Sequence, residues 1–269
     1  MDKVLFVATV TSHINAFHIP YLKWFKEQGY EVHVASKGNQ KIEYCDKHFD
    51  IPFERFPIKK NNLKAYKELK KIINENNYKI IHCHTPVGGV LARLAARKAR
   101  KNGTRVIYTA HGFHFYKGAP LLNWIIYYPI EKFLSRYTDC LITINEEDYE
   151  LAKNKFRASK VEMVNGVGVD ENKFQIPMTL QEKHNLRQQL GLRDDEFVLI
   201  YVAELNKNKN QKMLIETMKH INEDKIKLLL VGKGDLQQYY DDEVRKQNLE
   251  NKIIFAGYRT DIPRITENI

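Results

Sequence analysis

A chain of 269 residues with 43% hydrophobic residues is long enough for two domains and apolar enough to bury a core, which excludes a disordered protein. The net charge of +10, denser in the first half, is explained either by solvated helix faces or by an anionic partner. The candidate partners are lipid headgroups, a phosphorylated substrate and, least favoured without a nucleic-acid motif, nucleic acid. Three scattered cysteines and an opening without a signal peptide predict a soluble cytoplasmic protein, with peripheral contact at the inner face of the plasma membrane. Its longest uncharged stretch, Gly118–Ile130, is too short to span a bilayer.

Short apolar runs alternate with amphipathic stretches along the first part of the chain. Nearly continuous apolar strands separated by helices favour a parallel sheet that is covered on both faces. The predicted strands are Lys3–Thr9, Glu31–Ser36, Lys79–Cys83, Arg105–Thr109, Cys140–Ile144 and Val161–Val164, and the predicted helices are 15–28, 63–76, 87–101, 121–136 and 146–155.

A break follows Val164, where the stretch NGVGVDENKFQIP indicates a linker. After a charged helix at 179–190, a second series begins, with strands at Phe197–Ala203, Ile226–Gly232 and Lys252–Gly257 and helices at 210–220 and 235–248. We therefore expect an α/β protein of two tandem Rossmann-like, doubly wound domains. These are an N-terminal domain over 1–170, a linker and connecting helix over 171–190, and a C-terminal domain over 191–269. Because three parallel strands leave a sheet edge uncovered, the second domain is predicted to be incomplete.

Polar loops follow several predicted strands of the first domain, at the carboxyl ends where α/β proteins bind ligands. The loop YTAHGFHFYKG places His111 and His114 where an acid, a base or a hydroxyl partner is needed, although a structural role stays open for both. Of His82 and His84, in HCHTPVGG, we expect opposite orientations, one into the core and one toward the loops. His13, in TVTSHINAFH, joins this group, but without a carboxylate or a short ligand spacing the histidines predict no metal site.

The corresponding loops of the second domain suit a phosphate. Glycine-bearing loops ahead of helices offer free N–H groups and a positive helix end, which fits Gly232 and Gly234 in VGKGDL, although a plain tight turn fits as well. Lys207 and Lys209, in AELNKNKNQ, stand beside a helix start and form a better diphosphate site, with ordinary surface lysines as the alternative.

These stretches together resemble a known family. NGVGVDENKF, VAELNKNKNQKMLIETM, VGKGDL and IIFAGYRTDIP, with HINAFHIPYLKWFKEQGYEVHVAS and IIHCHTPVGGVLARLAAR earlier in the chain, resemble the retaining nucleotide-sugar glycosyltransferases of family four, which have the two-domain GT-B fold. The look-alikes are bacterial enzymes of capsular, exopolysaccharide and lipid-linked glycan assembly. The resemblance implies transfer of a hexosyl or N-acetylhexosaminyl group from a UDP-sugar bound by the second domain to a hydroxyl of a lipid-linked or polysaccharide acceptor bound by the first. It also implies retention at the anomeric carbon, no metal and no other cofactor.

The resemblance also assigns roles to residues. His111 matches the family's histidine near the transferred sugar and is the predicted catalytic residue. Lys209 matches a diphosphate-binding lysine, whereas Glu204 stands where the family has arginine, so either Lys207 assists or Glu204 has another role. Gly232, Gly234, Tyr258 and Arg259 complete the predicted donor site, and Ser12, His13, His84 and Phe113 are the predicted acceptor residues. Phe113, Phe115 and Tyr116 either shape an acceptor pocket or cover their loop.

Two alternatives accompany this reading. The family's pair of glutamates separated by seven residues, which contacts the sugar and the ribose, is absent from this chain, which suggests a catalytically incomplete fragment or a binding subunit that needs a partner. A GT-B nucleotide-sugar epimerase is the smaller alternative. Lys59, Lys60 and Lys64 are expected to contact anionic headgroups of a membrane.

Overall fold

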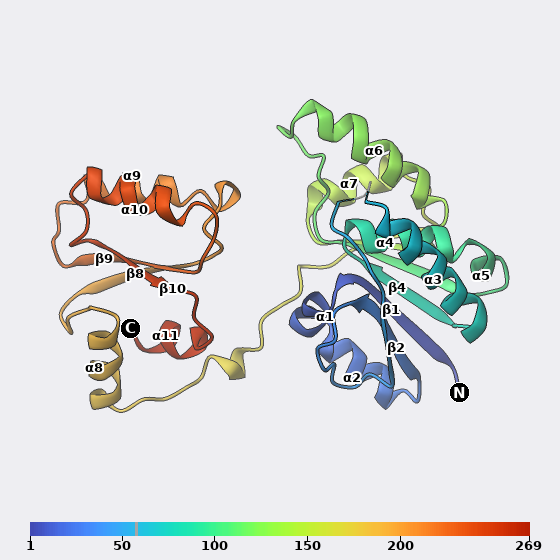
Figure 1. Ribbon diagram of the computed structural model, residues 1–269, viewed down its shortest axis with the longest axis horizontal. Coiled ribbons are helices and arrows are strands. Elements are labelled where there is room, and N and C mark those ends of the chain that lie inside the picture. Colours follow the sequence, from blue (N-terminus) through green and yellow to red (C-terminus); the bar gives the residue numbers. More distant parts are fainter. Residues whose placement is uncertain (57–58) are drawn as a thin grey trace. The chain divides into compact units, whose positions relative to one another are not determined.

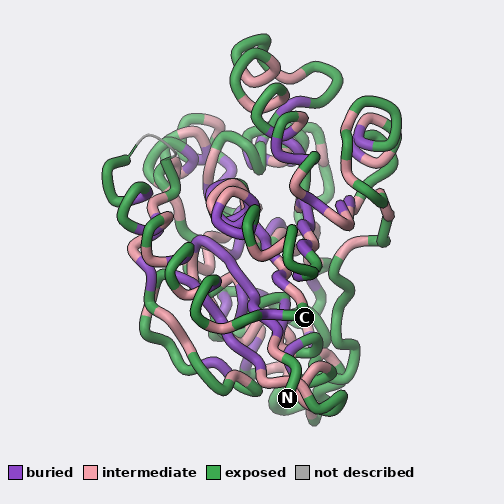
Figure 2. Tube along the Cα trace, turned by 90° about the vertical axis from the view of Figure 1, so that its right-hand side faces the viewer, coloured by how far each residue is buried: buried purple, intermediate pink, exposed green. Residues whose placement is uncertain are grey.

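The chain forms two compact α/β units, Met1–Gly168 and Val169–Ile269. The structure, a computed structural model, describes residues 1–56 and 59–269 (Figure 1). The division lies close to the predicted end of the first domain at residue 170. Buried residues concentrate along the strands and the inner faces of the helices, whereas most residues of the connections are at least partly exposed (Figure 2).

The first unit contains a parallel seven-stranded sheet in the order β3-β2-β1-β4-β5-β6-β7. The order runs outward from β1 in both directions, so the sheet is doubly wound, with its reversal point between β1 and β4. Six strands were predicted, and the sequence missed β3 because it is a short, largely polar edge strand. The strands are β1 Lys3–Val10, β2 Glu31–Lys37, β3 Lys47–Asp50, β4 Ile80–His84, β5 Arg105–Ala110, β6 Cys140–Thr143 and β7 Lys160–Met163.

Helices cover both faces of this sheet (Figure 1). A hydrophobic core lies on each face of the sheet, and alternate residues of β1 belong to different cores. Val4 and Phe6 pack with α1 and α2, whereas Leu5 and Val7 pack on the side of α3, α4, α6 and α7. The helix predicted at 15–28 is two helices, because Pro20 fits only the first turn of a helix. The helices are α1 Thr11–Phe17, α2 Ile19–Glu27, α3 Asn61–Asn76, α4 Pro86–Ala95, α5 Arg97–Lys101, α6 Leu121–Ser135 and α7 Glu146–Lys155.

The second unit has a parallel three-stranded sheet in the order β10-β9-β8. One face packs against α9 and α10, and the other against α8 and α11. Leu186 of α8 is buried against this sheet, so the helix that we predicted as a connection belongs to the second unit. The elements are η1 Glu171–Lys173, α8 Leu180–Gln189, β8 Phe197–Val202, η2 Lys207–Lys209, α9 Gln211–His220, β9 Ile226–Val231, α10 Gln237–Lys246, β10 Ile253–Gly257 and α11 Ile262–Asn268. Within the described ranges, no helix combines the length and apolarity needed to cross a membrane.

Candidate active site

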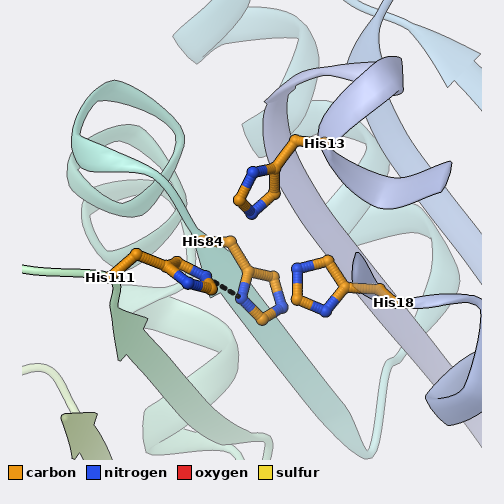
Figure 3. Close-up of side chains that lie close together, drawn as sticks. All are labelled: His13, His18, His84 and His111. Atoms are coloured by element: carbon orange, nitrogen blue, oxygen red, sulfur yellow. Dashed lines mark hydrogen bonds between the residues drawn. The ribbon is translucent and has the colours of Figure 1, made fainter. Parts of the chain in front are cut away.

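Four histidines from three neighbouring strand ends meet in the first unit (Figure 3). His13 lies on α1 just after β1, His18 joins α1 to α2, His84 ends β4, and His111 follows β5. Because β1, β4 and β5 are adjacent and parallel, their carboxyl ends open at one edge of the sheet. One ring nitrogen of each histidine lies within 4.8 Å of the others. The fold thus assembles a cluster that the sequence distributes over about a hundred residues.

The four rings are in mutual contact. His111 Nε2 lies 3.4 Å from His84 Nδ1, and the His18 ring stacks on that of His84 with centroids 3.8 Å apart. His13 meets His111 edge-on at 4.8 Å. Four buried ring nitrogens have no hydrogen-bond partner among the described residues: His13 Nε2, His84 Nε2 and both nitrogens of His18. Because buried polar atoms normally have a hydrogen-bond partner, these nitrogens distinguish the cluster from an ordinary core.

Burial keeps these imidazoles uncharged. Desolvation, with a smaller contribution from His111, lowers the pKa of His13 to about 4, and desolvation with neighbouring histidines lowers that of His18 to about 2. The pKa of His84 is held well below its ordinary value, and that of His111 is also lowered, in both cases mainly by desolvation. A neutral imidazole offers one N–H donor and one acceptor, which suits the hydroxyl groups of a sugar.

Hydrogen bonds from the loop to the start of α7 and to α6 anchor the His111 loop. The Asp148 carboxylate accepts a hydrogen bond from the Phe113 N–H at 2.9 Å, and the Asn123 side chain donates to the His114 carbonyl at 2.8 Å. Phe113 and Phe115 stack at 4.8 Å within the core. These anchors fix the position of His111 at the end of β5.

Two expectations for the first unit change, and one residue joins the site. Phe113 is only 7% exposed and faces the core, so it covers the loop and does not line an acceptor pocket. His82 and His84 point to the same side, with ring centroids 4.1 Å apart, because residues two apart in a strand share a face. Ser12 is exposed in the first turn of α1. His18, which lies in the quoted stretch TVTSHINAFH but was not singled out, is a member of the cluster.

Thr85 fixes the turn that follows His84. Its backbone has φ of 63°, in a region that residues with a side chain rarely adopt, and its hydroxyl accepts the Thr9 N–H at 3.0 Å. A side chain at Gly88 would press on Thr85 and on the β1 backbone. The start of α4 therefore packs closely against β1. This close packing requires a glycine at position 88, within the HTPVGG stretch.

In the second unit, the predicted lysines lie on a firmly built loop between β8 and α9. Asn206 caps η2 by accepting the Lys209 N–H at 3.0 Å, and the buried Gln211 side chain donates to the Glu204 carbonyl at 2.9 Å. Lys207 and Lys209 are exposed, and neither forms an ion pair within the described residues. Glu204 is exposed on the same loop and accepts a hydrogen bond from the Asn206 side chain at 3.0 Å.

Gly232 and Gly234 serve close packing between two strand-end loops. A Cβ on Gly232 would collide with the Ala203 carbonyl, and one on Gly234 with the Leu205 carbonyl. The Gly232 N–H is already used, because it donates to the Gly257 carbonyl at 2.8 Å. Close packing therefore accounts for both glycines. Lys233, exposed between them, is a cation that the sequence analysis passed over.

The loop after β10 carries the last two predicted donor residues. Tyr258 is 69% exposed. Arg259 donates two hydrogen bonds to Asp261, at 2.8 and 2.7 Å, so its charge is already paired. This loop and those of the lysines and glycines follow β10, β8 and β9, whose carboxyl ends share one edge of the second sheet.

Comparisons with known proteins show the family and the fold. Residues 3–145 match the glycosyl transferase 4-like family, and residues 182–268 match glycosyl transferases group 1. The chain is 50% identical over 268 residues to the putative glycosyltransferase EpsD of Bacillus subtilis, covering 98% of this chain and 70% of that protein. It is 30% identical to an Escherichia coli UDP-Gal:alpha-D-GlcNAc-diphosphoundecaprenol alpha-1,3-galactosyltransferase, over 76% of this chain and 53% of that protein. The structure of Anabaena HepE in complex with UDP superposes with a TM-score of 0.70 at 18% identity, over 98% of this chain and 71% of HepE.

The two α/β units, with polar loops at the carboxyl ends of their strands, define a GT-B glycosyltransferase fold, as the sequence predicted. The chain belongs to the glycosyl transferase 4-like family.

Proposed function

We propose that this protein transfers a hexosyl or N-acetylhexosaminyl group from a UDP-sugar to a hydroxyl of a lipid-linked or polysaccharide acceptor in bacterial surface glycan assembly, with retention of configuration. The galactosyltransferase relative, whose name specifies a UDP-sugar donor and a diphosphoundecaprenol-linked acceptor, supports this choice of substrates. The UDP bound to HepE supports the same donor nucleotide.

The observation that carries the proposal is the cluster of neutral histidines. His111 engages His84 through Nε2, so its Nδ1 is the nitrogen that can meet a sugar hydroxyl. We place the transferred sugar against His111 and the acceptor hydroxyl near His13 and His84. An uncharged imidazole there orients hydroxyl groups by hydrogen bonding and does not add a positive charge beside a developing oxocarbenium ion.

The departing diphosphate requires positive charge, which we assign to Lys207 and Lys209 with Lys233 beside them. Cations that are fixed where negative charge develops lower the barrier to departure of the leaving group. Glu204 opposes them electrostatically, and its hydrogen bond to Asn206, the cap of η2, gives it a structural role in their loop.

We propose that the transfer needs no metal ion. A hard cation that assists a diphosphate, such as Mg²⁺, takes oxygen ligands, and the histidine cluster offers only nitrogen. The donor set is closer to that of Zn²⁺, but the His18 and His84 rings are stacked with only 28° between their planes. Because a ring nitrogen binds a metal in the plane of the ring, stacked rings do not converge on one ion.

Calorimetric titration of the purified chain with UDP and UDP-sugars tests the donor assignment. We expect UDP binding that Lys209→Ala weakens about tenfold, since one lost charge contact to phosphate is worth roughly 1–2 kcal/mol. Lys219→Ala, at the end of α9, is the matched control and should bind as the wild type does.

The products then separate the alternatives. Incubation with a UDP-sugar and a lipid extract that contains the acceptors should yield UDP together with a glycosylated lipid. A free epimerised nucleotide sugar would indicate the epimerase, and the absence of UDP binding by a folded sample would indicate a fragment that needs a partner.

A further inference from the structure

Helix α6 carries an outward stripe of large apolar side chains. Leu122, Ile125, Ile126, Ile130 and Phe133 follow helical spacing, and they are between 40% and 63% exposed. Leu121, at the start of the helix, is 74% exposed. Isolated exposed apolar residues are common on proteins, but a contiguous patch of this kind marks a surface that binds something.

The stripe continues into a groove between α6 and α4. This cavity has a volume of about 640 Å³ and is lined mainly by apolar side chains. Val87, Val90 and Leu91 of α4 form one wall, Ile126 and Ile130 of α6 the other, and Lys59 lies at its border. The volume and the lining suit a hydrocarbon chain.

The outward face of α6 is free of negative charge, because its one carboxylate points inward and its only other charged residue is Lys132. Glu131 is 7% exposed and accepts a hydrogen bond from the buried Arg93 guanidinium at 2.8 Å. Arg93 in turn donates to the Gly89 carbonyl at 2.9 Å and lies over the Tyr108 ring at 3.9 Å. This buried ion pair fixes α6 to α4 and β5 and removes the only acid of the helix from its surface.

The unit that carries α6 accounts for the net positive charge of the chain. The first unit contains 27 Lys and Arg against 16 Asp and Glu, a net charge of +11, whereas the second contains 16 against 17, a net charge of −1. Helix α3, which packs beside α4, exposes four lysines, Lys64, Lys67, Lys70 and Lys71. An apolar helix face beside basic helices matches a bilayer with anionic headgroups.

We propose that the first unit docks on an anionic membrane through the outward face of α6, with lipid chains entering the groove between α6 and α4. The 15 residues of α6 rise about 22 Å, which fits a helix that lies in the interface plane. The loop that carries His111 leads directly into α6, so a docked helix holds that loop at the membrane surface. The inference deepens the proposed function, on which its link to a lipid-borne acceptor rests.

Vesicle flotation without any nucleotide or sugar tests the docking. Wild-type protein should float with vesicles of phosphatidylglycerol and phosphatidylcholine. The double variant Leu122→Glu, Ile125→Glu should bind at least about tenfold more weakly, because two charges would enter the interface. Leu180→Glu, at an 87% exposed position of the second unit, is the control and should bind as the wild type does. Equal flotation of wild type and double variant, or no flotation of the wild type, would overturn the proposal.

Fluorescence gives a second readout that does not depend on a charged variant. The chain has two tryptophans, Trp24 on α2 and Trp124 on α6, so Trp24→Phe leaves α6 as the only reporter. Brominated lipids should quench Trp124 if α6 enters the interface, and unchanged emission would contradict docking through this helix.

Two controls distinguish membrane docking from dimer formation and from a loss of UDP binding. Sedimentation without vesicles tests whether a second copy covers the stripe, and a dimer that the double variant dissociates would overturn membrane docking. UDP titration of the double variant should be unchanged from the wild type. Loss of flotation with intact UDP binding therefore concerns docking alone, whereas failure of UDP binding in all variants would concern the donor assignment.

Discussion

His111 Nε2 and His84 Nδ1 lie 3.4 Å apart and join the ends of β5 and β4 through two imidazoles. The contact fixes which nitrogen of His111 can face a substrate, and it makes the site a shared property of two strands. His13 and His18 extend it to β1 and its following helices.

His111→Ala should lower the turnover number for sugar transfer by about 100-fold while leaving the Kd for UDP unchanged, because the lost hydrogen bond is made to the reacting sugar and not to the nucleotide. Steady-state kinetics combined with UDP titration measure the two effects. His114→Ala is the matched control three residues away, where the ring packs on Tyr127 at 4.7 Å, and its turnover should stay within about twofold of wild type. Equal losses in both variants would assign the effect to loop structure.

Stability should fall as the pH drops below 6.5, since the cluster is neutral when folded and protonated when unfolded. The folded pKa of His13 is about 4, that of His82 about 3 and that of His18 about 2, against 6.5 when unfolded. The unfolded chain therefore takes up more protons in this window, and each such histidine removes about 1.4 kcal/mol per pH unit.

Urea unfolding between pH 6.5 and 5 isolates the effect, because ordinary carboxyl groups titrate near 3.8 to 4.5. His18→Phe should reduce the slope of unfolding free energy against pH by about 1.4 kcal/mol per unit. His220→Phe, at an exposed position of α9, should leave the slope as in wild type. A slope that His18→Phe does not alter would show that His18 is protonated in the folded protein.

Gly234→Ala should destabilise the second unit by about 3 kcal/mol or more, because the new methyl group would overlap the Leu205 carbonyl and push the lysine-bearing loop away. Urea unfolding measures the loss, and UDP binding should weaken as well. Gly191→Ala is the control, since a Cβ there meets nothing within 4 Å and only the backbone φ of 74° opposes it, which costs about 1 kcal/mol. Comparable losses for both variants would exclude the steric explanation.

Arg93→Met should destabilise the first unit by about 3–5 kcal/mol, because it leaves the Glu131 carboxylate buried without its partner. Chemical denaturation provides the measurement. The double variant Arg93→Met, Glu131→Met should recover most of that loss, since neither charge of this pair is then left buried. A double variant as unstable as the single one would show that packing on Tyr108, and not charge, dominates the contribution of Arg93.

Addition of EDTA should leave both UDP binding and sugar transfer unchanged, because the proposed partners of the diphosphate are lysines, which neutralise its charge without a metal ion. Titration and transfer assays with and without the chelator give the answer. Activity that chelation abolishes and Mg²⁺ or Mn²⁺ restores would contradict the metal-free transfer.

The sequence by itself determined the two-unit parallel architecture, because buried parallel strands are apolar runs that local composition displays, as in Lys3–Val10 and Ile226–Val231. It also placed His111 at the end of a strand. It missed β3, whose polar edge residues carry no such signal.

Only the tertiary structure decided which side chains meet. His18 joins the cluster because α1 and α2 turn it toward β4, Phe113 turns into the core, and Glu131 is drawn inward by Arg93. These outcomes depend on contacts between residues far apart in the chain, whereas local composition and spacing report only the burial and periodicity of each segment.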